Sequence, residues 1–222
     1  MIDRFFTPDY VERAVLRDGT PVRLRLLAPE DKELLRSGFE RLSAESRYAR
    51  FLGPKTMLSD DELRYLTEID QEDHFALGAV REEGDGHGEP VGLGIARFIR
   101  LGDGASAEAA IAVADEIQGL GLGRLLFVRL CAAAAERGIE RFHCEVLGSN
   151  TEMASLIAKV APARTIEVEG GVMRIELPLP NVAPREPTVG PPPAGPMYRL
   201  FRAAAANAVD WTEAVRKLWR RE

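Results

Sequence analysis

The chain has 222 residues, of which 45% are hydrophobic, so it can bury the core of one ordinary domain with an appendage. Its formal net charge of −6 argues against a general nucleic-acid binder, because no basic field would attract a phosphate backbone. The N-terminus lacks the apolar region of a signal peptide and no apolar run reaches membrane-spanning length, so we expect a cytoplasmic protein.

The first third of the chain predicts a strand followed by short helices. Residues 22–27 alternate apolar side chains with arginines, which is the pattern of a half-buried strand. Helix-spaced apolar residues then predict two or three short helices, over 33–42, 46–52 and 60–69. Ser59 and Glu62 form a capping-box pattern at the start of the last of them.

The middle of the chain predicts alternating strands and helices. Strand patterns cover 75–80, 91–99, 108–113, 141–147, 165–169 and 172–177, and helix patterns cover 124–137 and 151–160. A polar loop at 82–89 and the Gly170-Gly171 pair both predict hairpin turns. This order predicts an α/β (α+β) domain of residues 1–180, a mixed sheet with helices on both faces.

The C-terminal part predicts a linker and one further helix. Residues 181–196 are too rich in proline for helix or interior strand and predict an extended linker. Residues 197–222 carry apolar residues at steps of three and four, which predicts an amphipathic helix with a net charge of +3. We expect its apolar stripe to pack on the domain or a second subunit. A different protein and an anionic membrane surface are the alternatives, in that order.

A glycine-rich hexapeptide, from Gln118 to Gly123, lies between an expected strand and an expected helix. The first turn of a helix leaves backbone N–H groups without intrahelical partners, and the helix dipole adds partial positive charge there. Glycines let the backbone approach an anion closely and take positive φ, so this turn predicts a phosphate site. The spacing G-x-G-x-G, with no Lys-Ser or Lys-Thr after it, fits neither a dinucleotide fingerprint nor a P-loop. An ordinary strand-to-helix turn is the structural alternative.

The pattern Gln-x-x-Gly-x-Gly at 118–123 resembles the pyrophosphate loop of the GNAT superfamily of acyl-CoA N-acyltransferases. Residues 113–118 resemble the end of the family's fourth strand, and residues 145–150 resemble its fifth strand and the start of the next helix, in the family's order. Residues 42–51, LSAESRYARF, resemble one bacterial branch, the Pat-type protein lysine acetyltransferases that modify acyl-CoA synthetases. The resemblance implies a GNAT fold with a mixed, mostly antiparallel central sheet, and acetyl-CoA as co-substrate.

The resemblance also implies where the cofactor lies. The pyrophosphate would rest on the N–H groups of a run made of Gln118, Gly119, Leu120, Gly121, Leu122, Gly123 and Arg124. The strand around Ile111 and Val113 would splay from its neighbour, pair with the pantetheine and offer one N–H to the thioester oxygen. Asn150 has two interpretations, a helix cap or a contact to the pantetheine arm.

Glu108 is the candidate general base. A lysine amine, with an ordinary pKa of about 10.4, must lose a proton before it can attack. Glu108 lies where the Pat-type resemblance carries a catalytic glutamate, and period-two alternation puts it on the face of Ala110 and Ala112. A solvated glutamate at a strand start is the structural alternative. Ile157 stands where many relatives carry a tyrosine that protonates the departing thiolate, so we expect that thiolate to leave unassisted or with a proton from water.

Other candidate residues are weaker. His74, His87 and His143 are scattered and predict no metal site, and we expect Cys131 and Cys144 to be reduced and buried. For Tyr48 and Phe51, packing under a short helix and contact with the acceptor both stay open.

The sequence therefore predicts an acetyl-CoA-dependent N-acetyltransferase. The expected acceptor is a protein lysine, with an acyl-CoA synthetase as candidate, and a homo-oligomer would form through the C-terminal helix. The alternatives are an acetyltransferase for small amines and a non-catalytic module that senses acyl-CoA.

Overall fold

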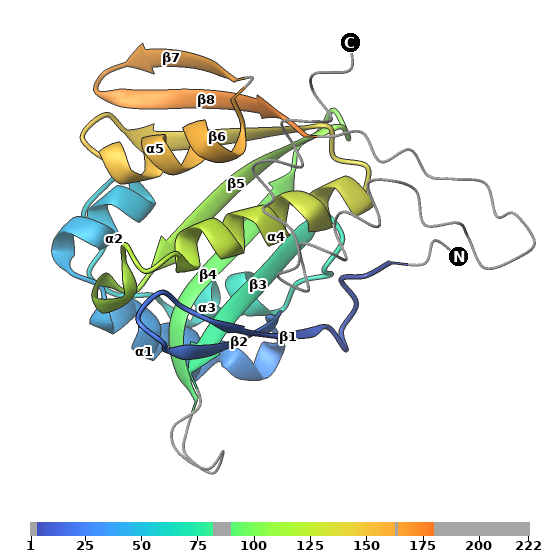
Figure 1. Cartoon of the computed structure of the whole chain (residues 1–222), viewed down its shortest axis with the longest axis vertical. Helices are drawn as coiled ribbons and strands as arrows, with labels where there is room; N and C mark the ends of the chain where they lie inside the picture. The colour runs from blue at the N-terminus through green and yellow to red at the C-terminus, as the bar shows by residue number, and fades with distance from the viewer. Residues whose placement is uncertain (1–3, 82–89, 163, 180–222) are drawn as a thin grey trace, which may run out of the picture.

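The computed structural model describes residues 4–81, 90–162 and 164–179 (Figure 1). These residues form an eight-stranded sheet in the order β1-β2-β3-β4-β5-β6-β8-β7. The strands are β1 (Val11–Val15), β2 (Pro21–Leu26), β3 (His74–Arg81), β4 (Val91–Arg100), β5 (Ser106–Val113), β6 (Arg141–Leu147), β7 (Thr165–Glu169) and β8 (Val172–Pro178). Neighbouring strands are antiparallel except β5 and β6, which confirms the predicted mixed, mostly antiparallel sheet.

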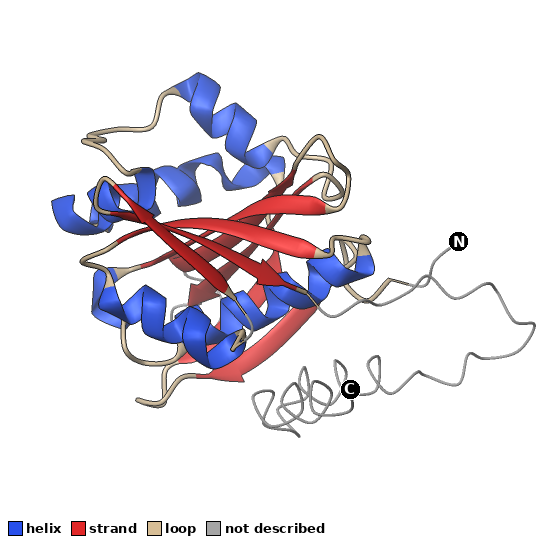
Figure 2. Cartoon of the chain, turned by 90° about the horizontal axis from the view of Figure 1, so that it is seen from above, coloured by secondary structure: helices blue, strands red, loops and turns tan. Residues whose placement is uncertain are grey.

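Helices cover both faces of the sheet, as predicted (Figure 2). They are α1 (Lys32–Arg41), α2 (Ala44–Phe51), α3 (Asp60–Thr67), α4 (Leu122–Glu136) and α5 (Thr151–Val160), with short 3-10 turns η1 (Pro29–Asp31) and η2 (Asp115–Ile117). The first three lie on one face, and α4 and α5 lie on the other (Figure 1). No helix in the described ranges is long and apolar enough to cross a membrane. The loop at 82–89, the linker at 181–196 and the helix at 197–222 lie outside the described residues.

The main core lies between the sheet and α4. Phe75, Phe98 and Phe142 come from three strands and are fully buried, with ring centroids 5.3 and 5.8 Å apart along the row. Helix α4 is apolar on most of its surface, and its four consecutive alanines at 132–135 are buried against this row. Small side chains let a helix approach a sheet closely, so α4 packs closely against β4 and β5.

A smaller core lies under α1, α2 and α3. Phe39, Leu58 and Leu63 form it, and the expected capping box of Ser59 and Glu62 is present beside it. Ser43 accepts from the Ser46 N–H at the start of α2, and the capping box of Ser59 starts α3. Caps of this kind stabilise short helices by about 1 kcal/mol each, which matters for helices of only two turns.

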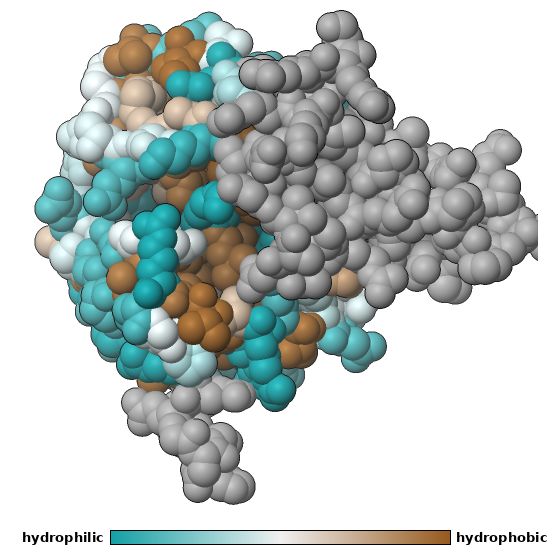
Figure 3. Space-filling model, viewed as in Figure 1, coloured by the Kyte–Doolittle hydropathy of each residue, from teal (hydrophilic) through white to brown (hydrophobic). Residues whose placement is uncertain are grey.

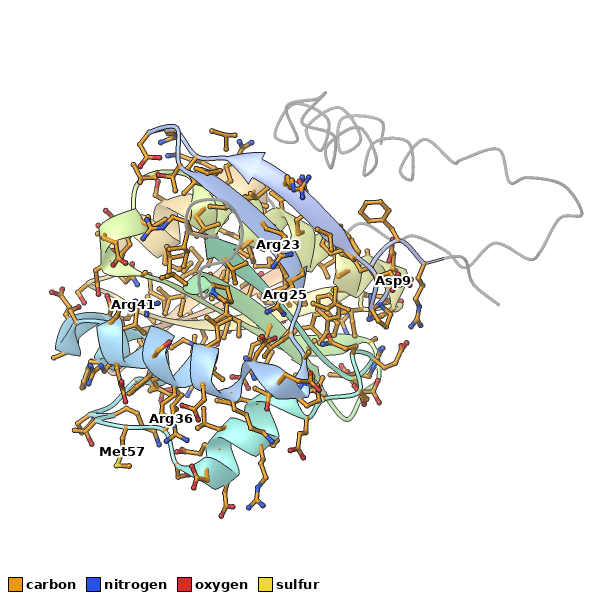
Figure 4. All side chains as sticks on the ribbon, turned by 90° about the horizontal axis from the view of Figure 1, so that it is seen from below. Asp9, Arg23, Arg25, Arg36, Arg41 and Met57 are labelled. Carbon is orange, nitrogen blue, oxygen red and sulfur yellow. The ribbon has the colours of Figure 1, made fainter. Side chains whose placement is uncertain are left out.

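Two arginines fasten α1 to the sheet (Figure 4). Arg25 of β2 binds both carboxylate oxygens of Asp31, just before α1, at 2.6 Å each. Arg41, at the other end of α1, donates to the Gly92 carbonyl of β4 at 2.6 Å. The helix is thus attached to the sheet at both ends.

Two differences from the prediction bear on the site described below. Strand β1 was not expected, because its two valines, Val11 and Val15, are exposed while Glu12 is buried on the core side. A reversed pattern of this kind gives no strand signal. Helix α4 begins at Leu122 and not at Arg124, because Gly121, with φ of +99°, is the N-cap.

Candidate active site

Strands β5 and β6 separate at the centre of the sheet. Their parallel ladder pairs only Ser106 with Arg141, Ala107 with Phe142 and Glu108 with His143. Beyond that last pair the two strands diverge, while β5 stays paired with β4 as far as Val113. The separation expected for the strand around Ile111 is therefore present. We call this opening the fork.

The backbone of β5 turns hydrogen-bonding groups toward the fork. Ala114 donates its N–H to the Leu93 carbonyl at 2.9 Å, and the antiparallel register is unbroken along β5. Because N–H groups alternate in direction along an antiparallel strand, those of Ile111 and Val113 point away from β4. They face the space that β6 has left, where an extended ligand could add itself as a strand.

The glycine loop has the geometry of an anion site. Gly119 and Gly121 have φ of +74° and +99°, conformations that side chains resist. The first α4 hydrogen bond runs from the Leu125 N–H to the Gly121 carbonyl, so the Leu122 and Gly123 amides belong to the open first turn. Gly123 lies against α5, where a Cβ would make an ordinary contact with the Leu156 side chain at 3.5 Å. The loop therefore aims a helix N-terminus and its dipole into the fork.

Arg17, in the turn between β1 and β2, braces this loop. Its backbone N–H donates to the Leu120 carbonyl and its guanidinium to the Gly119 carbonyl, both at 3.2 Å. The exposed guanidinium thus lies beside the predicted phosphate site. Sequence analysis missed Arg17 because β1, and with it this turn, carried no recognisable pattern.

Gln118 and Asp115 connect the loop to α2. The Gln118 amide donates to the Val113 carbonyl and to Asp115, both at 3.2 Å, and to Ser46 at 3.3 Å. Asp115 also accepts from the Ser43 N–H at 2.7 Å and from the Ser46 hydroxyl. The Gln118 side chain thus fixes the end of β5 and the position of α2 beside the fork.

A groove of about 860 Å³ follows the fork from the glycine loop to Glu108. Every predicted site residue lines it except Leu120 and Leu122. Leu122 is fully buried and Leu120 packs against the core, so only their backbone groups can serve the site. Figure 3 shows apolar surface in the hollow between the positions of α5 and α4. Phe127 of α4 and Met153 and Leu156 of α5 line the groove there.

Glu108 is exposed at the mouth of the fork. Its direct partner on β4 is Ile99, and Ala110 and Ala112 lie opposite Arg97 and Ile95, so these residues share the face covered by α1, α2 and α3. This confirms that Glu108 shares a face with Ala110 and Ala112.

Arg50 and Arg97 lie on the face of the sheet that Glu108 shares. Arg50 of α2 lines the groove, and burial lowers its pKa while the Glu108 carboxylate opposes that shift. Burial and the charge of Arg50 together lower the pKa of Arg97 to about 9. The Glu108 carboxylate thus interacts electrostatically with the buried Arg50 guanidinium.

The other predicted residues lie in or near the wall of the groove. Asn150 caps α5, accepting from the Met153 N–H at 3.0 Å, and it also lines the groove. Ile157 is buried in the groove wall, and its apolar side chain has no proton to donate. Cys131 and Cys144 are free and buried, and burial raises the pKa of Cys144 to about 12. Cys144 therefore stays a neutral thiol near pH 7.

Tyr48 and Phe51 have different environments in the structure. Phe51 packs against Phe39 with ring centroids 5.7 Å apart, so its aromatic ring contributes to the smaller core. Tyr48 is 47% exposed, so core packing is the wrong interpretation for it.

Comparisons with known proteins agree with this geometry. The sequence model of the acetyltransferase (GNAT) family matches residues 39–161. Acetyltransferase Pat of Mycolicibacterium smegmatis is 34% identical over 188 residues, which are 82% of this chain and 53% of that protein. An acetyltransferase of Pseudomonas aeruginosa is 33% identical over 141 residues, 64% of this chain and 74% of that protein. The chain thus spans about half the length of the mycobacterial relative.

One solved structure extends the likeness to three dimensions. The crystal structure of the GNAT domain of S. lividans PAT superposes with a TM-score of 0.67 at 34% identity. The match covers 76% of this chain and 97% of that domain.

Proposed function

Because this chain belongs to the GNAT acetyltransferase family, we propose that it transfers the acetyl group of acetyl-CoA to a protein lysine, with an acyl-CoA synthetase as candidate acceptor. The family supplies the reaction class and the co-substrate. The lysine and the synthetase rest on the likeness to Pat-type enzymes, which includes residues 42–51, that is α2 and the two residues before it, beside the groove.

The groove supports a specific placement of acetyl-CoA. The pyrophosphate lies on the amides from Gln118 to Arg124, with the Arg17 guanidinium beside the loop. The pantetheine lies in the fork and pairs with the outward backbone groups of Ile111 and Val113. One of these N–H groups then donates to the thioester oxygen and stabilises the negative charge that develops there.

The chemical step uses Glu108. The carboxylate accepts a proton from the lysine ammonium, and the neutral amine attacks the thioester carbonyl. The tetrahedral intermediate loses a second proton from its nitrogen to solvent and expels the CoA thiolate, leaving the amide. With Ile157 in the groove wall, the thiolate leaves as the anion or takes a proton from water. A single positioned base of this kind contributes about 10²- to 10⁴-fold to the rate.

One observation carries the proposal. Glu108 is the last residue of β5 paired with β6, so the only acidic side chain of β5 stands where the groove opens onto the α1–α3 face. Thioester and base are thereby brought together by a single strand. A module that merely senses acyl-CoA has no need of a carboxylate at that point.

The test is CoA release from acetyl-CoA in the presence of a panel of acyl-CoA synthetases and small amines, with acetylated lysines located by mass spectrometry. We expect release with at least one synthetase. Release with small amines alone would assign a small-molecule acetyltransferase. Thermal stabilisation by acetyl-CoA without release to any acceptor would favour the sensing module.

A further inference from the structure

Arg50 of α2 lies between the groove and a smaller apolar cavity. That cavity, of about 100 Å³, lies between the helices α1–α3 and the sheet, and Arg50 lines both spaces. Ala112 of β5 also lines both. Because the N–H groups of its neighbours Ile111 and Val113 face the fork, Arg50 lies beside the place proposed for the thioester.

The helix that carries Arg50 is held in position beside the fork. Ser46, four residues earlier on α2, lies on the same side of the helix and also lines the groove. Its hydroxyl donates to Asp115, and the Gln118 amide donates to it at 3.3 Å. The hydrogen bonds that fix the end of β5 therefore also keep this side of α2, with Arg50, toward the groove.

The donors of the Arg50 guanidinium are available to a bound molecule. Arg50 forms no hydrogen bond or ion pair with any residue that the structure describes, and its guanidinium lies over the Phe51 ring, 5.0 Å from the centroid. The Glu108 carboxylate acts on it electrostatically without forming an ion pair. A cation and a candidate base thus lie near the same end of the groove without occupying each other.

We propose that Arg50 is a catalytic residue, whose guanidinium pairs with the sulfur of CoA as the thiolate leaves. The inference rests on the proposed function, because it needs a thioester in the fork. When the tetrahedral intermediate collapses, the C–S bond breaks, its electron pair goes to sulfur and the carbonyl forms again. Ile157 offers no proton at this step, and a guanidinium keeps its own, so Arg50 stabilises the thiolate by charge and hydrogen bonding.

The charges around the reacting group support this role. Glu108 becomes neutral when it accepts the proton of the amine, and the sulfur becomes negative later in the same turnover. Arg97 is the neighbouring cation, and it is engaged with His74 at 3.0 Å and with the Leu66 carbonyl at 3.2 Å. An anion that forms beside these two guanidinium groups, next to apolar walls, is stabilised more than it would be in water.

The first test measures the thiol of bound CoA and needs no acceptor. Its pKa is determined from the ultraviolet absorbance of the thiolate, with the complex of desulfo-CoA, which lacks the thiol, as the blank for Cys131 and Cys144. An ordinary thiol has a pKa of about 8.5, and an opposite charge within a few ångströms lowers it by about 1–3. We expect a pKa of about 7 in the natural protein and in Arg50→Lys, and of about 8.5 in Arg50→Gln. Desulfo-CoA should bind all three equally.

The second test is turnover, which separates a catalytic Arg50 from one that only positions Glu108. Arg50→Gln should lower kcat by about 10- to 100-fold with little change in the KM for acetyl-CoA, and Arg50→Lys should retain most of the activity. In the double variant Arg50→Gln with Glu108→Gln the two losses should multiply, because the residues act on different charges. Arg36→Gln is the matched control, since Arg36 is an arginine of α1 that pairs with Asp60 and lines neither space. Thermal melting shows whether each variant is folded, and Arg50→Met replaces an unfolded Arg50→Gln.

The outcomes separate this inference from the proposed function. An equal pKa of the bound CoA thiol in the natural protein and in the folded Arg50 variant would overturn the assignment. A double variant no slower than Glu108→Gln alone would also overturn it and make Arg50 a positioning residue for Glu108. Absence of CoA release with every acceptor would instead contradict the proposed function, and the thiol pKa would still decide whether Arg50 contacts the sulfur.

Discussion

Glu108 on β5 and His143 on β6 form the last pair of the parallel ladder, and the groove opens directly beyond them. This pairing fixes the geometry of the candidate site. Before this pair, β5 and β6 are hydrogen-bonded to each other. Beyond it, the β5 backbone groups that point away from β4 are open to a ligand. The candidate base is therefore held at the rigid end of the fork, within reach of the open end.

Replacing Gly121 by glutamate should abolish cofactor binding. The substitution places a side chain at φ of +99° and a negative charge at the helix N-terminus, so strain and repulsion act together. For the natural protein, acetyl-CoA at one hundred times its Kd should stabilise the fold by about 2.7 kcal/mol, measured by thermal shift. Gly104→Glu, at φ of +74° outside the groove, is the control and should keep the shift. A normal shift in the Gly121 variant would remove the phosphate site.

Glu108→Gln should retain cofactor binding and lose about 10²- to 10⁴-fold in kcat, because the amide cannot accept the proton of the amine. Activity should recover in part at high pH, where more of the lysine is already neutral. Glu176→Gln changes an exposed glutamate one strand beyond β6 and should leave kcat unchanged. Full activity of the Glu108 variant at pH 7 would show that another group is the base.

Arg17→Ala should raise the KM for acetyl-CoA by about tenfold and leave kcat unchanged, because it removes one charged hydrogen-bond donor beside the glycine loop. The Arg17 N–H bond to Leu120 is a backbone bond and survives the substitution, so the loop keeps its course. The effect should shrink at high salt, which screens an exposed charge. Arg13→Ala, an exposed arginine of β1 outside the groove, should change neither constant.

The elements that carry the chemistry were predictable from local patterns. The strand at 108–113 and the glycine turn have signals confined to a few neighbouring residues, and the positive φ of Gly119 and Gly121 follows from residue type. The fork could be expected only from the resemblance, because strand separation depends on which strands pair across the sheet.

What sequence analysis missed depends on packing between distant segments. Strand β1 buries Glu12, which is held by Arg129 from a position 117 residues away. Arg17 reaches the glycine loop only because of that strand. The apolar cavity lies between three short helices and the sheet. The spacing of apolar residues along the sequence predicts elements but not the space left between them.

The buried ion pair of Glu12 and Arg129 should be critical for stability. Arg129 binds both Glu12 oxygens, at 2.7 and 2.6 Å, and Tyr10 donates to Glu12 at 2.5 Å. Glu12→Leu removes the carboxylate that holds the buried Arg129 guanidinium, so it should lower the free energy of unfolding by about 3–5 kcal/mol. The double variant Glu12→Leu with Arg129→Met should lose less than the single one. Urea unfolding measures both, and equal or greater loss in the double variant would contradict the buried-charge explanation.

His74 should make stability depend on pH below neutrality. Burial, and secondarily the nearby charge of Arg97, lower the pKa of His74 from 6.5 to about 4. Between these values the unfolded chain binds a proton that the folded chain excludes, so the free energy of unfolding should fall as the pH drops from 6.5 to 4. His74→Gln keeps an acceptor for Arg97 but cannot be protonated in this range, so it should flatten that part of the profile. Urea unfolding at several pH values measures the difference between variant and natural protein, in which carboxylate titrations common to both cancel. Identical slopes in the two proteins would show that His74 takes up its proton equally in the folded and unfolded states.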